Sequence, residues 1–172
     1  MKIIKNSSNL NLENLSFQFQ ERYINDTGFQ IPIYSDTLDN NGVTDSWSNK
    51  TNQHDIVDQI EQKIKPFIVE YAGDNDCVLY RAWISIHDII VEGKWADHAP
   101  EHNHWDVDFT SIFYVSVPED SGNLFIEIND QREIITPEKN DLVILDGDTC
   151  HSTGPNLAKE RRVTLVCDWL KN

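Results

Sequence analysis

Cysteine is scarce in this chain of 172 residues, which contains only Cys77, Cys150 and Cys167. Their number is odd and their spacing is wide. The sequence therefore lacks the Cys-x-x-Cys pairs that are typical of zinc ribbons and of thioredoxin-like redox sites. We interpret the three as reduced thiols in or near the core, as is usual for proteins of reducing compartments.

Basic residues are also few: 14 Lys and Arg stand against 29 Asp and Glu, which gives a formal net charge of −15. This excess of negative charge repels nucleic-acid backbones and anionic membranes. No stretch approaches the ~18 consecutive apolar residues that a membrane span needs. The first residues, Met1 to Asn6, lack the apolar run of a signal peptide. These absences predict a cytoplasmic protein with no nucleic-acid or membrane partner.

The N-terminal part, residues 1–76, is expected to be an arm followed by a helix. Residues 1–53 are rich in Asn, Ser, Asp and Gln, and we expect them to form an irregular arm that packs on the domain. Ile56, Ile60 and Ile64 recur every four residues, which predicts a helix over residues 54–72. Pro66 is expected to kink or split this helix.

The C-terminal part, residues 77–172, consists of short β-rich runs separated by turn residues. The runs are residues 78–87, 109–117, 123–128, 133–136, 141–145 and 162–169. No long helical segment lies between them, so a parallel sheet with crossover helices is not expected. The pattern predicts an all-β sandwich or barrel, and residues 1–172 as a whole are expected to form a single domain.

The densest polar cluster runs from His98 to Asp108, just before the strongest predicted strand. In an extended chain, residues two apart point to the same face, so His102, His104 and Asp106 would share one. Imidazole and carboxylate groups on one face make a chelate for a divalent metal. His151 follows another predicted strand and offers the distant third ligand that a facial metal site needs.

The residues Arg161, Arg162, Val163 and Thr164 lie at the start of the last predicted strand. Strand parity puts Arg162 and Thr164 on one face and Arg161 on the other, with Val163. A guanidinium beside a hydroxyl is a good clamp for a carboxylate.

Together these pieces resemble the 2-oxoglutarate- and iron(II)-dependent oxygenase superfamily, and within it the oxygenases found widely in marine bacteria and phages. The resemblance covers roughly residues 78–169 and departs from the family pattern at Ser111 and Asn140, where Gly is usual, and at Thr164, where Ser is usual. The matching segments are Trp83–Ile86, His102–His104, Thr110–Pro118, Ser121–Leu124, Pro137–Leu142, His151 and Arg162–Thr164. Asn tolerates the left-handed backbone conformation for which Gly is chosen.

The resemblance implies a mainly β fold, a double-stranded β-helix (a jelly roll, cupin-like), with one or two N-terminal helices packed on the sheet. It also implies iron(II) as the metal and 2-oxoglutarate as the cosubstrate. Arg162 would bind the far carboxylate of 2-oxoglutarate, with Thr164 and Tyr114 adding hydrogen bonds. The reaction would couple decarboxylation of 2-oxoglutarate to oxidation of a small-molecule or peptidyl substrate.

Two ligand sets remain open. The superfamily's usual pattern selects His104, Asp106 and His151, in which a carboxylate offsets the charge of the metal. The nearer relatives' pattern selects His102, His104 and His151. Arg161 also remains an alternative to Arg162 as the cosubstrate residue.

Two other functions fit the same architecture. One is a cupin-like metal protein or isomerase that does not use 2-oxoglutarate, for which a carboxylate clamp at Arg162 has no purpose. The other is a jelly-roll structural or binding domain without catalysis, for which an intact set of ligands is not expected.

Overall fold

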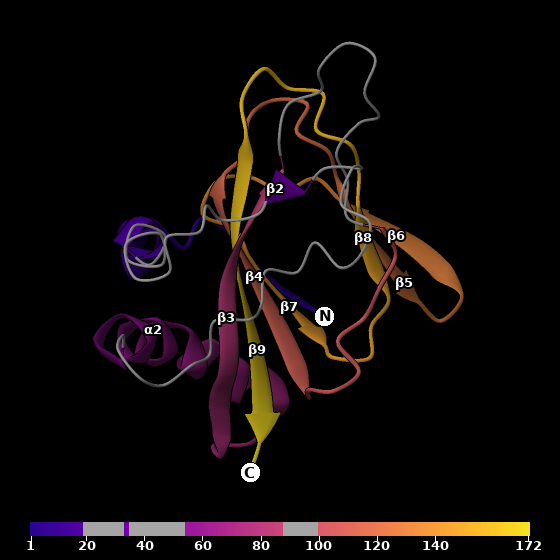
Figure 1. The fold of residues 1–172 in the computed structure, drawn as a ribbon. Coiled ribbons are helices and arrows are strands. Elements are labelled where there is room, and N and C mark those ends of the chain that lie inside the picture. The colour runs from indigo at the N-terminus through magenta and orange to yellow at the C-terminus, as the bar shows by residue number, and fades with distance from the viewer. Residues whose placement is uncertain (19–32, 35–53, 88–99) are drawn as a thin grey trace.

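Two sheets, antiparallel except for one strand pair, form the framework of the protein (Figure 1). The structure is a computed structural model that describes residues 1–18, 33–34, 54–87 and 100–172. The larger sheet has the strand order β1-β7-β4-β9-β3-β2, in which only the β2–β3 pair is parallel, and the smaller has the order β6-β5-β8. The strands are β1 (Lys2–Ile4), β2 (Ile33–Tyr34), β3 (Cys77–His87), β4 (Phe109–Ser116), β5 (Leu124–Ile128), β6 (Gln131–Ile135), β7 (Leu142–Asp146), β8 (His151–Thr153) and β9 (Arg162–Lys171).

One face of the large sheet is covered by helix α2 (His54–Ala72), as Figure 1 shows. The helix buries a stripe of isoleucines at every fourth position: Ile56, Ile60, Ile64 and Ile68. They pack against strand residues such as Ile84 and Leu165 in one apolar cluster. The helix runs through Pro66 without a break, so the predicted split does not occur.

The opposite face of the large sheet packs against the small sheet. Trp83, Ile112 and Val166 from the large sheet form a second apolar cluster with Leu124 and Ile126 of β5. Because successive residues of a strand point to opposite faces, β9 sends Leu165 to the helix and Val166 to the small sheet. This alternation selects the side chains that face the interior between the sheets.

Part of the N-terminal arm that the sequence predicts to be irregular has regular structure. Strand β1 pairs with β7 at the edge of the large sheet, a 3-10 turn (η1, Ser8–Leu10) follows, and residues 12–18 are helical. A strand of three residues is too short to show periodicity, and its formation depends on a partner more than 130 positions away. Within residues 1–53, segments 19–32 and 35–53 lie outside the described residues.

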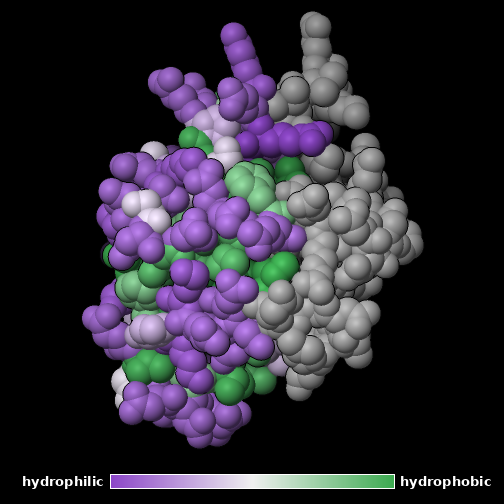
Figure 2. All heavy atoms as spheres, turned by 90° about the vertical axis from the view of Figure 1, so that its left-hand side faces the viewer, coloured by the Kyte–Doolittle hydropathy of each residue, from purple (hydrophilic) through white to green (hydrophobic). Residues whose placement is uncertain are grey.

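The six predicted strands all exist, with ends that differ by one or two residues, whereas β8 was not predicted. Asn140 adopts a positive φ of 70°, which confirms the left-handed turn expected where the family uses Gly. Among the described residues, the face of the molecule on the α2 side carries mostly hydrophilic side chains with hydrophobic ones between them (Figure 2). Among the described residues, no helix combines the length and the apolar character needed to cross a membrane.

Candidate metal centre

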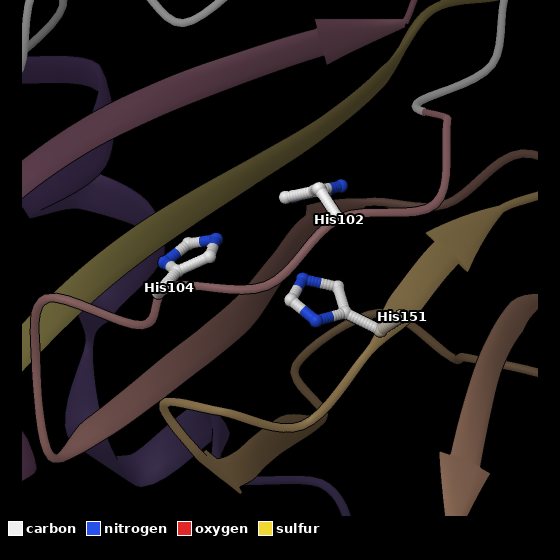
Figure 3. A group of neighbouring side chains, drawn as sticks. All are labelled: His102, His104 and His151. Carbon is white, nitrogen blue, oxygen red and sulfur yellow. The ribbon is translucent and has the colours of Figure 1, made fainter.

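Three histidines, His102, His104 and His151, point toward one another (Figure 3). One ligand atom of each lies within 4.8 Å of those of the other two. The rings of His104 and His151 are buried and that of His102 is half-buried. Within the described residues, this is the one group of three or more His, Cys, Asp or Glu side chains close enough to hold a metal ion. His98, from the same polar cluster of the sequence, lies outside the described residues.

Backbone hydrogen bonds fix the spacing of the three rings. His102 and His151 form an antiparallel bridge, in which His102 N–H donates to the His151 carbonyl at 2.9 Å and His151 N–H donates to the His102 carbonyl at 2.8 Å. His151 begins β8, which pairs with β5. The N–H of His104 donates to the Gly147 carbonyl at 2.7 Å. The rings are therefore attached to segments that are held in place before a metal arrives.

In each of the three rings, Nδ1 lies within hydrogen-bond distance of an acceptor oxygen. His102 Nδ1 lies 2.7 Å from the Pro100 carbonyl, and His151 Nδ1 lies 3.0 Å from the Thr149 carbonyl. His104 Nδ1 lies 2.7 Å from Oδ1 of Asp168. Carbonyl and carboxylate oxygens accept hydrogen bonds, so Nδ1 carries the proton in each neutral ring and Nε2 keeps its lone pair. This is the outer hydrogen-bonding pattern that metal-binding histidines usually have.

Burial favours the neutral form of two of the candidate ligands, His102 and His151. Burial, and next the proximity of His102, lower the pKa of His151 to about 4. Burial also lowers the pKa of His102 from its ordinary value, although the hydrogen bond to Pro100 opposes the change. A metal binds the neutral imidazole, so neither ring has to lose a proton near neutral pH. Three such nitrogens suit a divalent first-row metal such as iron or zinc.

Asp106 lies apart from this group. The extended segment ends at His104, and residues 105–106 form a turn, so the strand parity used for the sequence prediction does not reach Asp106. Its two carboxylate oxygens accept hydrogen bonds from the Arg81 guanidinium at 2.8 and 2.9 Å. The structure thus brings His102, His104 and His151 together and pairs Asp106 with an arginine.

Asp168 is a residue of the site that the sequence analysis missed. It lies on β9, is fully buried, and accepts hydrogen bonds from His104 and, at 2.5 Å, from the Thr110 hydroxyl. Its other oxygen accepts from Arg81 Nε at 2.6 Å. One signal was present in the sequence: a carboxylate in the apolar run 165–169 has to be buried with a partner.

A cavity adjoins the three histidines on the inner face of the large sheet. The predicted cosubstrate residues Tyr114, Arg162 and Thr164 all line it, and Arg161 is exposed at the surface. Arg162 is buried, and its Nη1 donates to the carbonyls of Ser121 and Gly122 at 2.8 and 3.0 Å. Burial raises the pKa of Tyr114 to about 12, so the phenol keeps its proton. The full lining is Trp83, Ser85, His87, His102, His104, Ile112, Tyr114, His151, Thr153, Arg162, Thr164 and Val166.

The β3–β9 register arranges the cavity wall in layers. Trp83 lies opposite Val166, and the Trp83 ring stacks on His104 with the ring centroids 5.6 Å apart. The last layer pairs His87 with Arg162, four residues further along each strand. At about 3.3 Å per residue, the backbone of this layer lies ~13 Å from the first. The histidine group and the guanidinium therefore belong to different ends of the same cavity.

The middle layer contributes hydroxyl groups. Ser85 lies opposite Thr164 on β9, and Tyr114 of β4 lies opposite the same threonine. Ser85 and His87 were not predicted to be part of the site, because a serine and a histidine in an apolar strand carry no motif of their own. The wall therefore offers a guanidinium and several hydroxyls to a bound anion, as a carboxylate requires.

No family model and no curated protein matches the chain in sequence. Solved structures match its fold. One is a prolyl hydroxylase in complex with a hypoxia inducible factor peptide fragment from Trichoplax adhaerens, with a TM-score of 0.67 and 12% identity over 99% of this chain and 83% of that one. Another is AviO1 from Streptomyces viridochromogenes, with a TM-score of 0.65 and 11% identity over 94% of this chain and 84% of that one.

A third match is an oxidoreductase of the 2OG-Fe(II) oxygenase family from Burkholderia pseudomallei, with a TM-score of 0.54 and 13% identity over 64% of this chain. This chain spans about half of that protein's length, 51%. The likenesses establish the fold, a jelly roll shared with 2-oxoglutarate-dependent iron(II) oxygenases. At such low identity, fold alone does not transfer an activity, which has to be argued from the site.

Proposed function

We propose that the protein is an oxygenase that uses iron(II) and 2-oxoglutarate to oxidise an organic substrate. One observation carries the proposal: a group of three inward-pointing histidines and a buried arginine, Arg162, line the same cavity. A metal site at one end and a guanidinium at the other suit a molecule with an acid group at each end. Fold likeness to 2-oxoglutarate-dependent enzymes adds to this reasoning by analogy.

In this proposal His102, His104 and His151 hold the metal through Nε2. Three protein ligands leave coordination positions open for a cosubstrate and for oxygen. The bound iron would supply the redox chemistry that side chains cannot perform, which is activation of oxygen coupled to decarboxylation of 2-oxoglutarate. Asp106, whose oxygens both accept from Arg81, has no ligand role in this assignment.

The cavity wall would bind and orient the cosubstrate. Arg162 would pair with its far carboxylate, and Thr164 would donate a hydrogen bond to it. Tyr114, buried and protonated, would donate another. Trp83 and Ile112 would exclude water around the metal, because they contribute apolar surface to the lining. The substrate is proposed to be a small organic molecule or a peptide side chain; the Trichoplax adhaerens enzyme was solved with a peptide.

A second candidate function is a cupin-like metal protein that does not use 2-oxoglutarate. One observation favours it: within the described residues, the ligand group contains three histidines and no carboxylate. The two functions differ in whether the metal-loaded protein binds 2-oxoglutarate at the metal.

Anaerobic titration of the metal-free protein with iron(II) and then 2-oxoglutarate separates the candidates. The oxygenase predicts a visible charge-transfer band that decays when oxygen enters, with formation of succinate. Iron binding without the band, and without succinate, would favour the cupin-like protein. Absence of iron binding would contradict both.

A further inference from the structure

Asp168 is a buried carboxylate whose hydrogen bonds lead to a candidate metal ligand. It lies in the apolar part of β9 with no exposed surface. Burying a charge is costly unless partners compensate it, so its surroundings indicate what it does. Its Oδ1 accepts from His104 Nδ1 at 2.7 Å and from Thr110 at 2.5 Å, while its Oδ2 accepts from Arg81 Nε at 2.6 Å.

The three candidate ligands differ in what accepts their Nδ1 proton. His102 and His151 donate to backbone carbonyls, and only His104 donates to a carboxylate. A carboxylate makes the imidazole a stronger donor to the metal than a carbonyl does, and it fixes the ring's tautomer and orientation. Asp168 is therefore placed to act on the metal through one ligand.

We propose that Asp168 is a positioning residue that supplies, through His104, the negative charge that a set of three imidazoles lacks. This inference rests on the proposed function in one respect, namely that a metal binds the three histidines. Two neutral rings and one ring paired with a carboxylate then face the divalent ion. The carboxylate offsets part of its charge without occupying a coordination position.

Arg81 connects this carboxylate to the turn that follows His104. Its Nε donates to Asp168, and its two terminal nitrogens donate to Asp106 at 2.8 and 2.9 Å. The guanidinium is therefore shared between two carboxylates, and Asp168 keeps charge to act on His104. Thr110 holds the Asp168 oxygen that faces the imidazole, so the carboxylate is held from both sides.

The test compares Asp168→Asn with Asp141→Asn. Asp141 is another buried carboxylate, which accepts from Lys5 Nζ at 2.6 Å and from the Glu138 amide at 2.8 Å. Cobalt(II) affinity is measured by competition with a chelator, and the ligand-field absorption is recorded at saturating metal. We expect Asp168→Asn to weaken cobalt binding by ~10–100-fold and to shift the absorption bands. Asp141→Asn is expected to change neither, although both variants lose thermal stability.

Arg81→Gln provides a second test, in which no loss of cobalt affinity is expected. It removes the cation and leaves the Asp168 carboxylate, so cobalt affinity should stay at or above the wild-type value. A purely structural network predicts a loss of affinity in both variants. Equal losses in Asp168→Asn and Arg81→Gln, or wild-type spectra in Asp168→Asn, would therefore overturn the inference. If Asp168→Asn does not fold, the affinity of Arg81→Gln alone decides.

The metal affinity of the wild-type protein distinguishes a failure of the proposed function from a failure of this inference. If the wild-type protein binds neither cobalt(II) nor iron(II), the metal site itself is wrong and this inference falls with it. If the wild-type protein binds metal and Asp168→Asn binds it equally well, only the role of Asp168 is wrong.

Discussion

Gly147 lies directly against the backbone of His104. The His104 N–H donates to the Gly147 carbonyl at 2.7 Å, and a Cβ added to Gly147 would lie 2.8 Å from the His104 carbonyl oxygen. The same Cβ would lie 2.0 Å from the carbonyl oxygen of Val107. Because both obstacles are backbone atoms, a side chain at position 147 can be accommodated only if the segment carrying His104 and the turn at Gly147 move apart.

Gly147→Ala is therefore expected to weaken metal binding and to lower stability. Forcing a methyl group into a filled site costs about 1–3 kcal/mol, and here the displaced segment carries a candidate ligand. Gly73→Ala is the matched control: Gly73 has a φ of 66° but no atom within 4 Å of an added Cβ. It should cost about 1–2 kcal/mol in backbone strain and leave metal affinity unchanged. Chelator competition and thermal unfolding measure both effects, and equal metal affinities in the two variants would contradict the prediction.

The two ligand sets left open by the sequence can be separated by one pair of variants. His102→Gln should reduce metal affinity by at least about 100-fold, since the binding free energy of a protein metal site is shared among few ligands. Asp106→Asn should leave the affinity within about threefold, because the Asp106 carboxylate is paired with Arg81 at the edge of the site. Isothermal titration with zinc or cobalt provides the comparison. The reverse pattern would restore the set of His104, Asp106 and His151.

Arg162→Met should weaken 2-oxoglutarate binding to the iron-loaded protein under anaerobic conditions. Losing a charge-assisted hydrogen bond costs about 1.5–3 kcal/mol, which is a ~10–150-fold rise in Kd. Iron affinity should change little, because Arg162 lies in the cavity layer furthest from Trp83 and His104. Arg161→Met is the control. Arg161 is exposed, and it is the residue just before β9, so its side chain is expected on the face opposite to that of Arg162. An effect confined to the Arg161 variant would assign the clamp to Arg161.

The stability of the metal-free protein should fall as the pH drops from about 6.5 toward 4. His151 has a folded pKa of about 4 against an ordinary value of 6.5, so in this window the unfolded chain binds a proton that the folded protein excludes. One pKa unit corresponds to about 1.4 kcal/mol, which gives a loss of about 3 kcal/mol across the window and no further loss below it. Urea unfolding in the presence of a chelator measures this loss. In His151→Gln this pH-dependent loss of stability should disappear. If the free energy of unfolding of the two proteins changed with pH in parallel, the assignment of the loss to His151 would be refuted.

The sequence by itself determined the features that depend on local periodicity. The isoleucine repeat of residues 54–72 places a buried stripe on one side of a helix, whatever that helix packs against. Strand parity separates Arg162 and Thr164 from Val163, and the structure has the first two in the cavity wall. The spacing of His102 and His104, two residues apart, predicted two of the three histidines that cluster in the structure. These features follow from the geometry of one segment.

The tertiary structure decided which distant residues meet. The His102–His151 bridge, the pairing of β1 with β7, and the contact between Asp168 and His104 join positions that are 49 to more than 130 residues apart. Such contacts depend on how strands order and align in a sheet, and local patterns of hydrophobicity do not encode that order. Asp106 shows where a local pattern fails. Strand parity predicted that it lies beside the histidines, but the chain turns after His104 and the Asp106 carboxylate pairs with Arg81. The pairing of β4 with β9 sets Thr110 opposite Asp168, and His104 lies in the segment that leads into β4.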